Sequence, residues 1–435
     1  VGQADGQGNV TGFPRNADGT PQTSVTFTCA ELGEQQVELW SLDLAGNADY
    51  CQTYVLVQDN SGNCGSDGAT IAGVLATETL DGLEDATVEV STGSVVKTDL
   101  TDNFGAYEVK KVPFGVDATV TPVKDDNPLN GVSTYDLVLI SKHILGLEPL
   151  NSPYKMIAAD ANKSGSITTF DVVELRKLIL GIYTELPNNT SWRFVDKSFA
   201  FADNSNPFKS AFPENKSLAN VQNSALSEDF VAMKIGDVNG SAVANALMSA
   251  EDRSSGTLYL EVSDRVVKAG ESFEASFKAS DRALGYQLTL GLSGLTVAGV
   301  VAGEGVSEDN FGVFADALTV SVDGSASFTV RFRASRSGLL SELLSVSSRV
   351  TRAEAYSVGG ARQEVALRFH SAAGSTTTKG VGFELYQNEP NPFVEQTAVR
   401  FHLPEASEAT LRVFDQSGKL LFEQTGSYTK GYHAI

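Results

Sequence analysis

Twelve residues, DANKSGSITTFD, carry oxygen-bearing side chains at a regular set of positions. In loops that wrap a hard cation such as Ca²⁺, side-chain oxygens at positions 1, 3 and 5, a main-chain carbonyl at 7 and a carboxylate at 12 surround the ion. This stretch also has the turn-forming glycine at position 6 and a threonine at position 9, where a hydroxyl or a water completes the shell. The predicted ligands are Asp160, Asn162, Ser164, the carbonyl group of Ser166, Thr168 and Asp171.

A polar turn that only caps the following helix is the simpler interpretation of the same residues. A cap requires one polar side chain, whereas five polar side chains align at ligand positions here. We therefore interpret the stretch as a calcium loop.

The elements that must position this loop are helices, and the sequence contains two of them in the same register. STYDLVLISKHILG from Ser133 and TTFDVVELRKLILG from Thr168 place apolar residues at helical spacing and end in glycine, which is a helix stop signal. Asp136 and Asp171 are 35 residues apart, and so are the two terminal glycines. This constant offset predicts a duplicated unit in which a loop runs into a helix.

The first copy of the loop, DDNPLNGVSTYD, runs for twelve residues from Asp125 to Asp136 and has Asn127 at position 3. Its glycine is one position late and Leu129 occupies position 5, so one oxygen ligand is missing. We expect Asn130, or a donor from elsewhere in the chain, to complete this site.

One candidate donor is the fragment IGDVNG at residues 235–240. It resembles the opening of a third loop, with Asp237, Asn239 and Ser241 at positions 1, 3 and 5, but Met248 at position 12 cannot close it. We expect the fragment to lend Asp237 and Asn239 to the deficient first loop. An ordinary Asp–Asn turn is the alternative.

Two such loops, each ending in aspartate and running into an apolar helix, resemble the dockerin module over residues 124–183. The resemblance implies that the pair of loops binds Ca²⁺, that the two helices pack together, and that one face docks a cohesin. The sequence departs from dockerins in the insert IYTELPNNTSWRFVDKSFAFADNSNPF that follows. With this insert, the predicted dockerin-like module spans residues 124–248.

Short alternating strands separated by turn residues fill most of the remaining sequence and predict β-sandwich modules. IAGVLATETLDGLEDATVEV and TDNFGAYEVKKVPFG, within residues 65–123, resemble the prealbumin-like modules that serve as stalks in secreted proteins. VKAGESFEASFKASDRALGYQLTLGL, within residues 249–371, resembles a cohesin-like sandwich. A dockerin-like and a cohesin-like unit in one chain imply either intramolecular packing or head-to-tail association between chains.

Residues 1–64 are expected to form a partial Ig-like module. VTFTC, QQVELWSLDL and CQTYVLVQD alternate apolar and polar residues, as strands do. The segment from Asp43 to Asn47, with its flanking cysteines, resembles the later half of the hyalin-repeat modules of bacterial surface proteins. We expect the module to be cut, because its first half would lie before Val1 or within the glycine-rich opening.

All three cysteines lie in this N-terminal part of the chain. No CxxC spacing or nearby histidine supports zinc, so the clustering favours a local disulfide over a metal site. Cys29 and Cys51 lie on alternating strands, and we predict a disulfide between them, with buried thiols as the alternative. Cys64 is then left to pair with chain that is missing from this sequence.

The C-terminal residues 383–435 follow a small-residue segment at 372–382 that we predict to be a flexible linker. QNEPNPF, TAVRFHLP, LRVFDQSGKLL and the GYH ending resemble the C-terminal sorting module of type IX secretion, a Bacteroidota system. FDQSGKLL is predicted to be a turn between two strands. The resemblance implies export to the cell surface by the type IX secretion machinery, with the last strands of the module after Ile435.

Composition limits the partners and the fold. A chain of 435 residues is expected to form about two to four domains. A net charge of −22 repels nucleic acids and anionic lipid surfaces. No run approaches the roughly 18 apolar residues of a membrane span, and no signal peptide is visible. The predicted fold class is mainly β, with serial β-sandwich modules and one small α-helical, dockerin-like module of paired calcium loops.

The sequence contains no constellation of residues that predicts catalysis. Its four histidines stand in different modules, and neither HExxH nor GxSxG is present. We expect a non-catalytic, calcium-stabilised structural or adhesive protein of the cell surface that associates with itself or with a cohesin- or dockerin-type partner. The alternative is the non-catalytic tail of a larger secreted hydrolase. A carbohydrate-binding module would need a row of exposed aromatic residues, and Trp40 and Trp192 are too few and too scattered to provide it.

Overall fold

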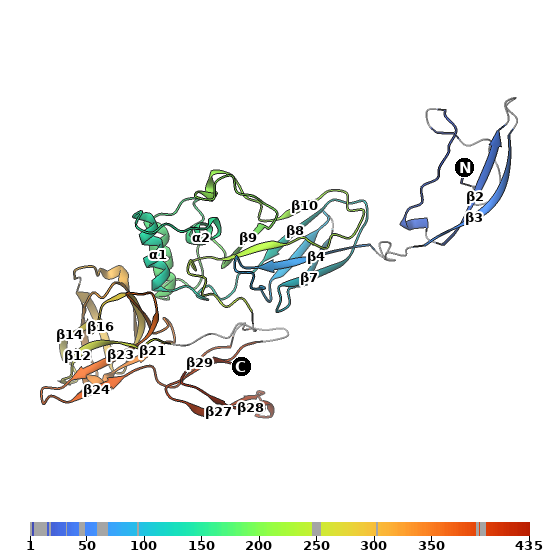
Figure 1. Cartoon of the computed structure of the whole chain (residues 1–435). Coiled ribbons are helices and arrows are strands. Elements are labelled where there is room, and N and C mark those ends of the chain that lie inside the picture. Colours follow the sequence, from blue (N-terminus) through green and yellow to red (C-terminus); the bar gives the residue numbers. More distant parts are fainter. Residues whose placement is uncertain are drawn as a thin grey trace.

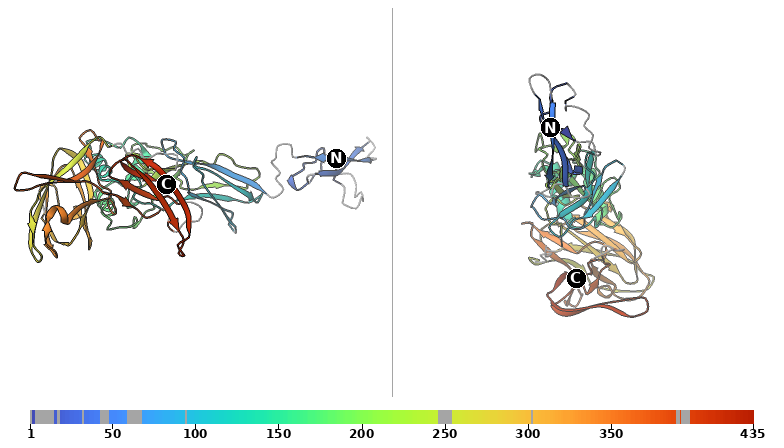
Figure 2. Two further views of the ribbon diagram at one scale, coloured as in Figure 1. Left: turned by 90° about the horizontal axis from the view of Figure 1, so that it is seen from below. Right: turned by 90° about the vertical axis from the view of Figure 1, so that its right-hand side faces the viewer.

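The computed structural model is mainly β, with several separate sheets and a small group of helices, so the predicted fold class is confirmed. Most of the units follow one another along an elongated molecule with the N-terminal sheet at one end, but the C-terminal strands lie back towards its middle (Figure 1, Figure 2). The structure describes residues 2–3, 15–16, 19–31, 33–42, 48–58, 68–93, 95–245, 254–301, 303–388, 391 and 397–435.

The N-terminal unit is a small antiparallel sheet in the order β1–β2–β3. Trp40 of β2 lies opposite Tyr50 of β3, and their rings stack with centroids 4.8 Å apart. The segment from Asp43 to Asn47, which carries the hyalin-repeat resemblance, lies outside the described residues. The described elements are β1 (Gly2–Gln3), η1 (Cys29–Glu31), β2 (Gly33–Leu42) and β3 (Ala48–Val57).

The predicted disulfide between Cys29 and Cys51 is wrong. Cys51 is an exposed free thiol, whereas Cys29 is part of a disulfide. The strand register explains the difference, because Cys51 lies in the middle of β3 opposite Leu39, while Cys29 precedes β2 and has no place in that pairing. Cys64, the third cysteine of the chain, lies outside the described residues.

We expect iodoacetamide to label Cys51, and to leave Cys29 unlabelled, in the folded protein without reductant. An exposed thiol reacts through its thiolate, whereas a cystine does not react. Peptide mapping by mass spectrometry gives the readout, and Cys51→Ser is the control that should remove the label. Label on Cys29 in the untreated protein would contradict the assignment.

The first sandwich consists of two four-stranded sheets, in the orders β10–β8–β5–β6 and β7–β4–β11–β9. Apolar side chains that alternate along β4 and β5, such as Ile71, Leu75 and Val88, fill the space between the sheets. The strands are β4 (Ala69–Ala76), β5 (Thr87–Ser91), β6 (Val96–Leu100), β7 (Ala106–Val112), β8 (Ala118–Val123), β9 (Trp192–Asp196), β10 (Lys216–Leu218) and β11 (Phe230–Lys234).

Three strands of this sandwich, β9, β10 and β11, come from residues that the sequence analysis assigned to the helical module at 124–248. β11 pairs in parallel with β4, with Phe230 opposite Leu75, and β10 pairs with β8. The predicted sandwich at residues 65–123 is therefore discontinuous. β9 and β11 are buried along their whole length, so they lack the polar alternation that identifies a half-exposed strand.

The helical unit lies in the chain between β8 and β9. It contains α1 (Thr134–Ile144) and α3 (Thr169–Ile179), as the duplicated pattern predicts, and also α2 (Pro153–Ala159). α1 and α3 both begin with a capping box, in which an N-cap hydroxyl residue and an aspartate three positions later bond each other's main chain. Leu137, Ile140 and Leu175 belong to the apolar core of this unit.

The second sandwich forms one hydrogen-bonded path in the order β16–β19–β14–β12–β23–β22–β15–β18–β17. The path encloses a core that includes Phe277, Tyr286 and Phe332. Its elements are β12 (Thr257–Ser263), β13 (Val266–Val267), β14 (Ser272–Ala279), β15 (Ala283–Leu292), β16 (Leu295–Val301), η3 (Glu308–Asn310), β17 (Phe311–Val313), β18 (Ala317–Asp323), β19 (Phe328–Ala334), β20 (Gly338–Leu339), α4 (Leu340–Leu343), β21 (Leu344–Ser347), β22 (Glu354–Ser357), β23 (Arg362–His370) and β24 (Thr376–Lys379).

The second sandwich extends further than predicted, because β24 pairs with β23 and makes part of the expected linker at residues 372–382 a strand. The predicted hairpin around FDQSGKLL is confirmed as β27–β28. A three-stranded sheet, β25–β26–β29, contacts the second sandwich, where Glu384 accepts a hydrogen bond from the main chain of Ser348 at 2.9 Å. The strands are β25 (Glu384–Leu385), β26 (Arg400–Leu403), β27 (Ser407–Phe414), β28 (Leu420–Tyr428) and β29 (Gly431–Ala434).

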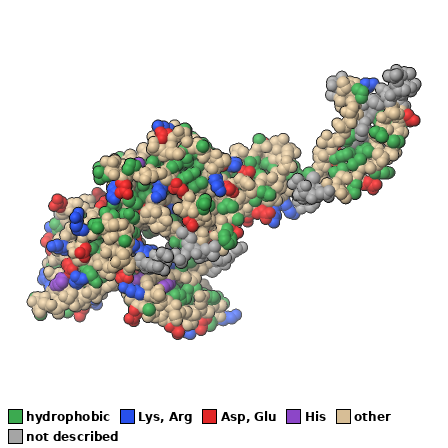
Figure 3. Space-filling model, in the orientation of Figure 1, with side chains coloured by type: hydrophobic (Ala, Val, Ile, Leu, Met, Phe, Trp, Pro, Cys, Tyr) green, Lys and Arg blue, Asp and Glu red, His purple; other side chains and the backbone are tan. Residues whose placement is uncertain are grey.

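On the face shown in Figure 3, acidic and basic side chains are interspersed along the sandwiches and the helical unit. None of the described helices is long and apolar enough to cross a membrane.

Candidate metal centre

The continuous loop predicted from the sequence lies between α2 and α3, and its main chain folds back on its first carboxylate. Asp160 accepts hydrogen bonds from the main-chain N–H groups of Ser164 and Gly165, both at 2.8 Å. Lys163, at position 4, has a left-handed main-chain conformation with φ of 57°. The first carboxylate of the loop is therefore held at the centre of the turn.

The last carboxylate of the continuous loop is fixed by the start of α3. Asp171 accepts hydrogen bonds from the main-chain N–H groups of Asn162 at 3.2 Å and Thr168 at 2.8 Å. The second of these bonds belongs to the capping box, so the same contact starts the helix and positions the carboxylate. The hydroxyl of Ser164 donates to the carbonyl of Ser166 at 3.2 Å. All the predicted ligand residues of this loop therefore share one hydrogen-bonded turn.

Both carboxylates of the continuous loop are removed from solvent, since Asp160 is 1% and Asp171 is 0% exposed. Burial raises the pKa of Asp171, main-chain hydrogen bonds from Thr168 and Asn162 oppose this shift, and the charge of Asp160 adds to it. Lys163 beside them lies within 3.8 Å of Glu214 instead. A bound cation would relieve the repulsion between the two carboxylates.

A second arrangement of the same kind is built from two segments far apart in the sequence. In one segment, Asp237 accepts main-chain hydrogen bonds from Ser241 at 3.2 Å and Ala242 at 2.8 Å. These donors follow the aspartate by four and five positions, which is the spacing found in the continuous loop. Gly240, at position 4, has a φ of 78°, so it shares the left-handed conformation of its counterpart.

The other segment is the start of α1. Asp136 accepts hydrogen bonds from the main-chain N–H groups of Asn239 at 3.2 Å and of the N-cap residue Ser133 at 3.0 Å. The hydroxyl of Ser241 donates to the carbonyl of Gly131 at 3.0 Å, as position 5 does to position 7 in the continuous loop. We call this arrangement the split loop; its positions 1, 3, 5, 7, 9 and 12 are Asp237, Asn239, Ser241, the carbonyl of Gly131, Ser133 and Asp136.

The first loop predicted from the sequence, from Asp125 to Asp136, does not fold around its own two ends. Asp125 accepts a hydrogen bond from the main chain of Ser191 at 2.7 Å, and Asn127 lies in a turn with φ of 43°. Leu129, at the deficient position 5, packs against the apolar core of the helical unit. Burial of this apolar side chain is favourable, so the segment packs against the core and does not wrap around an ion. Oxygen ligands for the first half of the loop must then come from another part of the chain.

We expected Asn130 to complete the loop from Asp125 to Asp136. Instead, its side chain bonds the main chain just after the second segment of the split loop in chain order. Its amide donates to the carbonyl of Val243 at 2.8 Å, and its side-chain oxygen accepts from the N–H of Val243 at 2.9 Å. In the split loop, which ends at Asp136, positions 1 and 3 are occupied by Asp237 and Asn239, the residues that the IGDVNG fragment indicated.

Ser133 and the carbonyl of Gly131 are site groups that the sequence analysis missed. Both were marked by the 35-residue offset, because Ser133 corresponds to Thr168 and Gly131 to Ser166. Subtracting 35 from the numbers of the ligand residues in the second half of the continuous loop would have identified both groups.

The carboxylates of the split loop are buried close to one another. Burial, followed by the charge of Asp237, raises the pKa of Asp136 well above its usual range, and burial also raises the pKa of Asp237. The ammonium group of Lys234 donates to the carbonyl of Pro128 at 2.8 Å, and burial lowers its pKa to about 7. Because burial disfavours the charged form of this lysine, it compensates the two carboxylates only in part.

The donor sets of both loops fit Ca²⁺. Each contains two carboxylates together with amide, hydroxyl and main-chain oxygens, which are the ligands that this hard cation prefers. In the part of the chain that the structure describes, no three histidine, cysteine or acidic side chains cluster in a way that could hold a metal ion. Each loop would therefore depend on amide, hydroxyl and main-chain oxygens in addition to its two carboxylates.

We expect the continuous loop to bind Ca²⁺ more tightly than the split loop, because its ligands are brought together by twelve consecutive residues. In isothermal titration, Asp160→Asn should remove the stronger binding phase and Asp237→Asn the weaker one. Asp125→Ala serves as the matched control and should keep both phases. Loss of the stronger phase in the Asp237 variant alone would refute the ranking.

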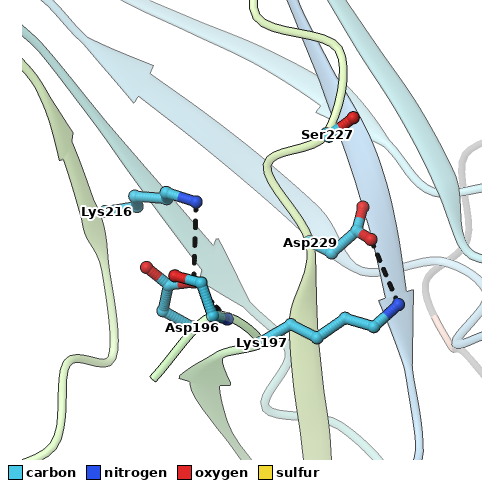
Figure 4. Close-up of a pocket in the computed structure, with 6 residues that line it drawn as sticks. Asp196, Lys197, Lys216, Ser227 and Asp229 are labelled. Atoms are coloured by element: carbon cyan, nitrogen blue, oxygen red, sulfur yellow. Dashed lines mark hydrogen bonds and ion pairs between the residues drawn. The ribbon is translucent and has the colours of Figure 1, made fainter. Parts of the chain in front are cut away.

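Two cavities of about 200 Å³ lie away from both loops. In the first, shown in Figure 4, Lys197 pairs with Asp229 at 3.1 Å and Lys216 lies 3.6 Å from Asp196, so its charges compensate one another. The second lies between the second sandwich and the C-terminal strands, and is lined by Arg352, Glu354, Arg362, Glu364, His402, Lys430 and Tyr432 among others. In the first cavity the hydroxyl and the main-chain N–H of Ser198 both donate to the carboxylate of Asp196, at 2.8 and 2.9 Å, so this contact belongs to a local turn.

The helices that carry both loops dock on the second sandwich of the same chain. Thr134, the first residue of α1, donates its N–H and its hydroxyl to Oε1 of Gln287 at 2.6 and 2.8 Å, and its hydroxyl lies 2.8 Å from that of Ser321. Arg176 of α3 donates to the carbonyl of Ser321 at 3.0 Å and to the carboxylate of Asp323 at 2.7 Å. Of the two arrangements that the sequence left open, the structure shows intramolecular packing.

Side chains of the same sandwich also donate hydrogen bonds to the carbonyl groups at the C-terminal end of α3. The hydroxyl of Thr319 donates to the carbonyl of Leu180 at 2.7 Å, and that of Thr351 donates to the carbonyl of Ile179 at 2.6 Å. Carbonyls at the end of a helix lack partners within the helix, so these bonds replace water and fix the helix end on the sandwich.

No protein-family model matches the sequence, and no curated protein is similar to it. Among solved structures, 29% of this chain is similar to 99% of a chain from a type I cohesin–dockerin complex of Clostridium thermocellum, at 9% identity and a TM-score of 0.21. A non-cellulosomal cohesin of Archaeoglobus fulgidus covers 30% of this chain and 87% of its own, at 18% identity and a TM-score of 0.15. The major pilin subunit of Bacillus cereus covers 84% of both chains, at 8% identity and a TM-score of 0.19. Similarities of this size assign neither a function nor a partner.

Proposed function

We propose that the chain is a non-catalytic, extracellular structural or adhesive protein of the cell surface in which Ca²⁺ locks neighbouring modules together. The observation that carries this proposal is the pair of equivalent loops at the starts of α1 and α3. The split loop joins the segment after β11 of the first sandwich to α1, since Asp136 accepts a hydrogen bond from the N–H of Val238 at 2.9 Å. The helices in turn dock on the second sandwich, so calcium would fix the two sandwiches relative to each other.

Export and self-association are further parts of the proposal. The resemblance of residues 383–435 to the type IX sorting module supports delivery to the cell surface by that machinery. The docking face of the helices is occupied within the chain, so copies would associate through other surfaces or by exchanging helical units. A cohesin- or dockerin-type protein is the alternative partner.

Calcium removal tests the proposal directly. Isothermal titration should find two calcium ions per chain, and excess chelator should lower the melting temperature. A ligand that binds only the folded state stabilises it by about 4 kcal/mol at a thousand times its dissociation constant. The double variant Asp160→Asn, Asp237→Asn is the control, and its melting temperature should not respond to calcium.

Light scattering on the same samples tests self-association, which predicts a larger particle in calcium than in chelator. A native chain that binds no calcium would overturn the calcium part of the proposal. A monomer of unchanged size in both conditions would overturn self-association and favour the alternative, a C-terminal accessory and sorting region of a larger secreted hydrolase.

A further inference from the structure

The cavity between the second sandwich and the C-terminal strands is built from both units. The sandwich supplies Arg352 and Arg362 to its lining, and the C-terminal part supplies His402 and Lys430. The ammonium group of Lys430 lies 2.7 Å from the carboxylate of Glu364 on β23, so an ion pair joins the two units at the cavity. A ligand in this cavity would therefore contact both units at once.

The charged side chains that line the cavity are positive on balance. Among the described residues of the lining, Arg352, Arg362 and Lys430 are basic, whereas only Glu354 and Glu364 are acidic. The chain as a whole carries a net charge of −22, so this lining departs from the average of the molecule. Partial removal from bulk water strengthens the attraction between a positive lining and an anion.

Stacking on an aromatic ring orients one of these cations. The guanidinium group of Arg352 lies 4.0 Å from the centre of the Tyr432 ring, whereas its Nε is 3.8 Å from Glu354, beyond hydrogen-bond distance. The Oε1 atom of Glu354 accepts hydrogen bonds from Tyr356 at 2.8 Å and Gln287 at 3.3 Å, so its own sheet holds this carboxylate. The N–H groups of a stacked guanidinium lie in its plane, where they match the two oxygens of a carboxylate.

His402 adds a hydrogen-bond acceptor to the same lining. Its side chain is buried against Tyr432, and its Nδ1 lies 2.8 Å from the carbonyl oxygen of Gly382. A carbonyl oxygen cannot donate, so Nδ1 carries the proton and Nε2 of the neutral ring is an acceptor. A ligand hydroxyl can donate to this nitrogen, whereas a sulfate ion has no proton to offer.

We propose that this cavity binds a small hydroxylated carboxylic acid of the sugar-acid type. Its carboxylate would meet Arg352, Arg362 and Lys430, and a hydroxyl would donate to His402. The cavity has a volume of about 200 Å³, and a cavity of about 150 Å³ already admits a benzene ring, so one six-membered ring fits. This inference goes beyond the proposed function and does not depend on calcium binding.

Isothermal titration of the full chain in saturating calcium, at constant ionic strength, tests the inference with four probes. Glucuronate carries both groups, glucose lacks the carboxylate, cyclohexanecarboxylate lacks the hydroxyls, and sulfate carries charge alone. We expect glucuronate to bind at least about tenfold more tightly than glucose, because hydrogen bonds to charged groups are the strong ones. It should bind at least about threefold more tightly than cyclohexanecarboxylate or sulfate.

Variants on both sides of the cavity supply the second arm. Arg362→Gln and Lys430→Gln should each weaken glucuronate binding at least about fivefold. Lys110→Gln is the matched control and should leave it unchanged, because Lys110 forms an exposed pair with Glu108 at 2.9 Å on β7 of the first sandwich. His402→Phe keeps a ring but removes its nitrogens, so glucuronate should lose its advantage over cyclohexanecarboxylate.

The outcomes distinguish a specific site from a charged gap. No binding of glucuronate at millimolar concentrations, equal binding of glucose, or unchanged affinity in both cation variants would overturn the inference. Sulfate that binds as tightly as glucuronate would show a general anion site and overturn the assignment to a hydroxy acid. If a variant unfolds, the four probes on the native chain still decide the question. None of these results depends on the calcium loops, so the proposed function is tested separately.

Discussion

Replacing Gly131 with alanine is expected to lower the free energy of unfolding by about 3 kcal/mol or more. Gly131 has a φ of 75°, and a Cβ placed on it would lie 2.5 Å from the main-chain nitrogen of Ala242 and 2.6 Å from its Cα. Main-chain atoms cannot rotate away as a flexible side chain can. The added methyl group would therefore strain the left-handed residue and also push apart the two segments of the split loop.

Gly165→Ala in the continuous loop is the matched control for this substitution. Gly165 has a similar φ of 77°, but no atom lies within 4 Å of its added Cβ, so only the backbone strain of about 1 kcal/mol remains. Urea unfolding and calcium titration measure both variants. The Gly131 variant should also lose the weaker calcium phase, and equal losses of stability in the two variants would show that the contact with Ala242 does not matter.

Arg176→Ala is expected to weaken docking of the second sandwich by about 2–3 kcal/mol. The guanidinium group is buried and connects the carbonyl of Ser321 to the carboxylate of Asp323. Its removal deletes two charge-assisted hydrogen bonds from a buried contact, which costs more than the loss of an exposed contact, although the carbonyl of Ser321 keeps the amide of Asn310 as a donor at 2.7 Å. In calorimetry, the second sandwich should then unfold in a transition of its own, separate from that of the helical unit.

Arg331→Ala is the control for the loss of an arginine–carboxylate pair. Arg331 lies 2.8 Å from Glu274, but its side chain is 59% and that of Glu274 is 55% exposed. Exposed pairs contribute little, so this substitution should change stability by less than about 0.5 kcal/mol. Similar effects of the two arginine substitutions would contradict the role of Arg176 in docking.

The parts of the candidate site that could be predicted are those determined by neighbouring residues. The helices α1 and α3 follow from apolar spacing with a stop glycine, and the capping boxes follow from Ser133 and Thr168 with an aspartate three positions later. The continuous loop was predictable because all its ligands lie within twelve residues.

The remaining parts depend on contacts between distant segments, which a local pattern does not specify. Asp237 and Asn239 matched the first half of a loop, but only the folded first sandwich brings them to Asp136. β9 and β11 were missed because burial on both faces removes the alternation of polar residues. The wrong disulfide arose from the assumption that Cys29 and Cys51 face each other, which the register of β2 and β3 excludes.

The position of β11 between β4 and β9 determines in what order the protein can fold. β4 can pair with β11 only after the helical unit and the strands that follow it have been synthesised. The contacts of the first sandwich therefore join residues far apart in the sequence, so this sandwich has a high contact order and should fold slowly. During translation, β4 would stay an open edge over that interval, which makes it a place where chains aggregate. A recombinant fragment that stops at Val123 would keep this edge open permanently, whereas a fragment that continues to residue 245 would close it.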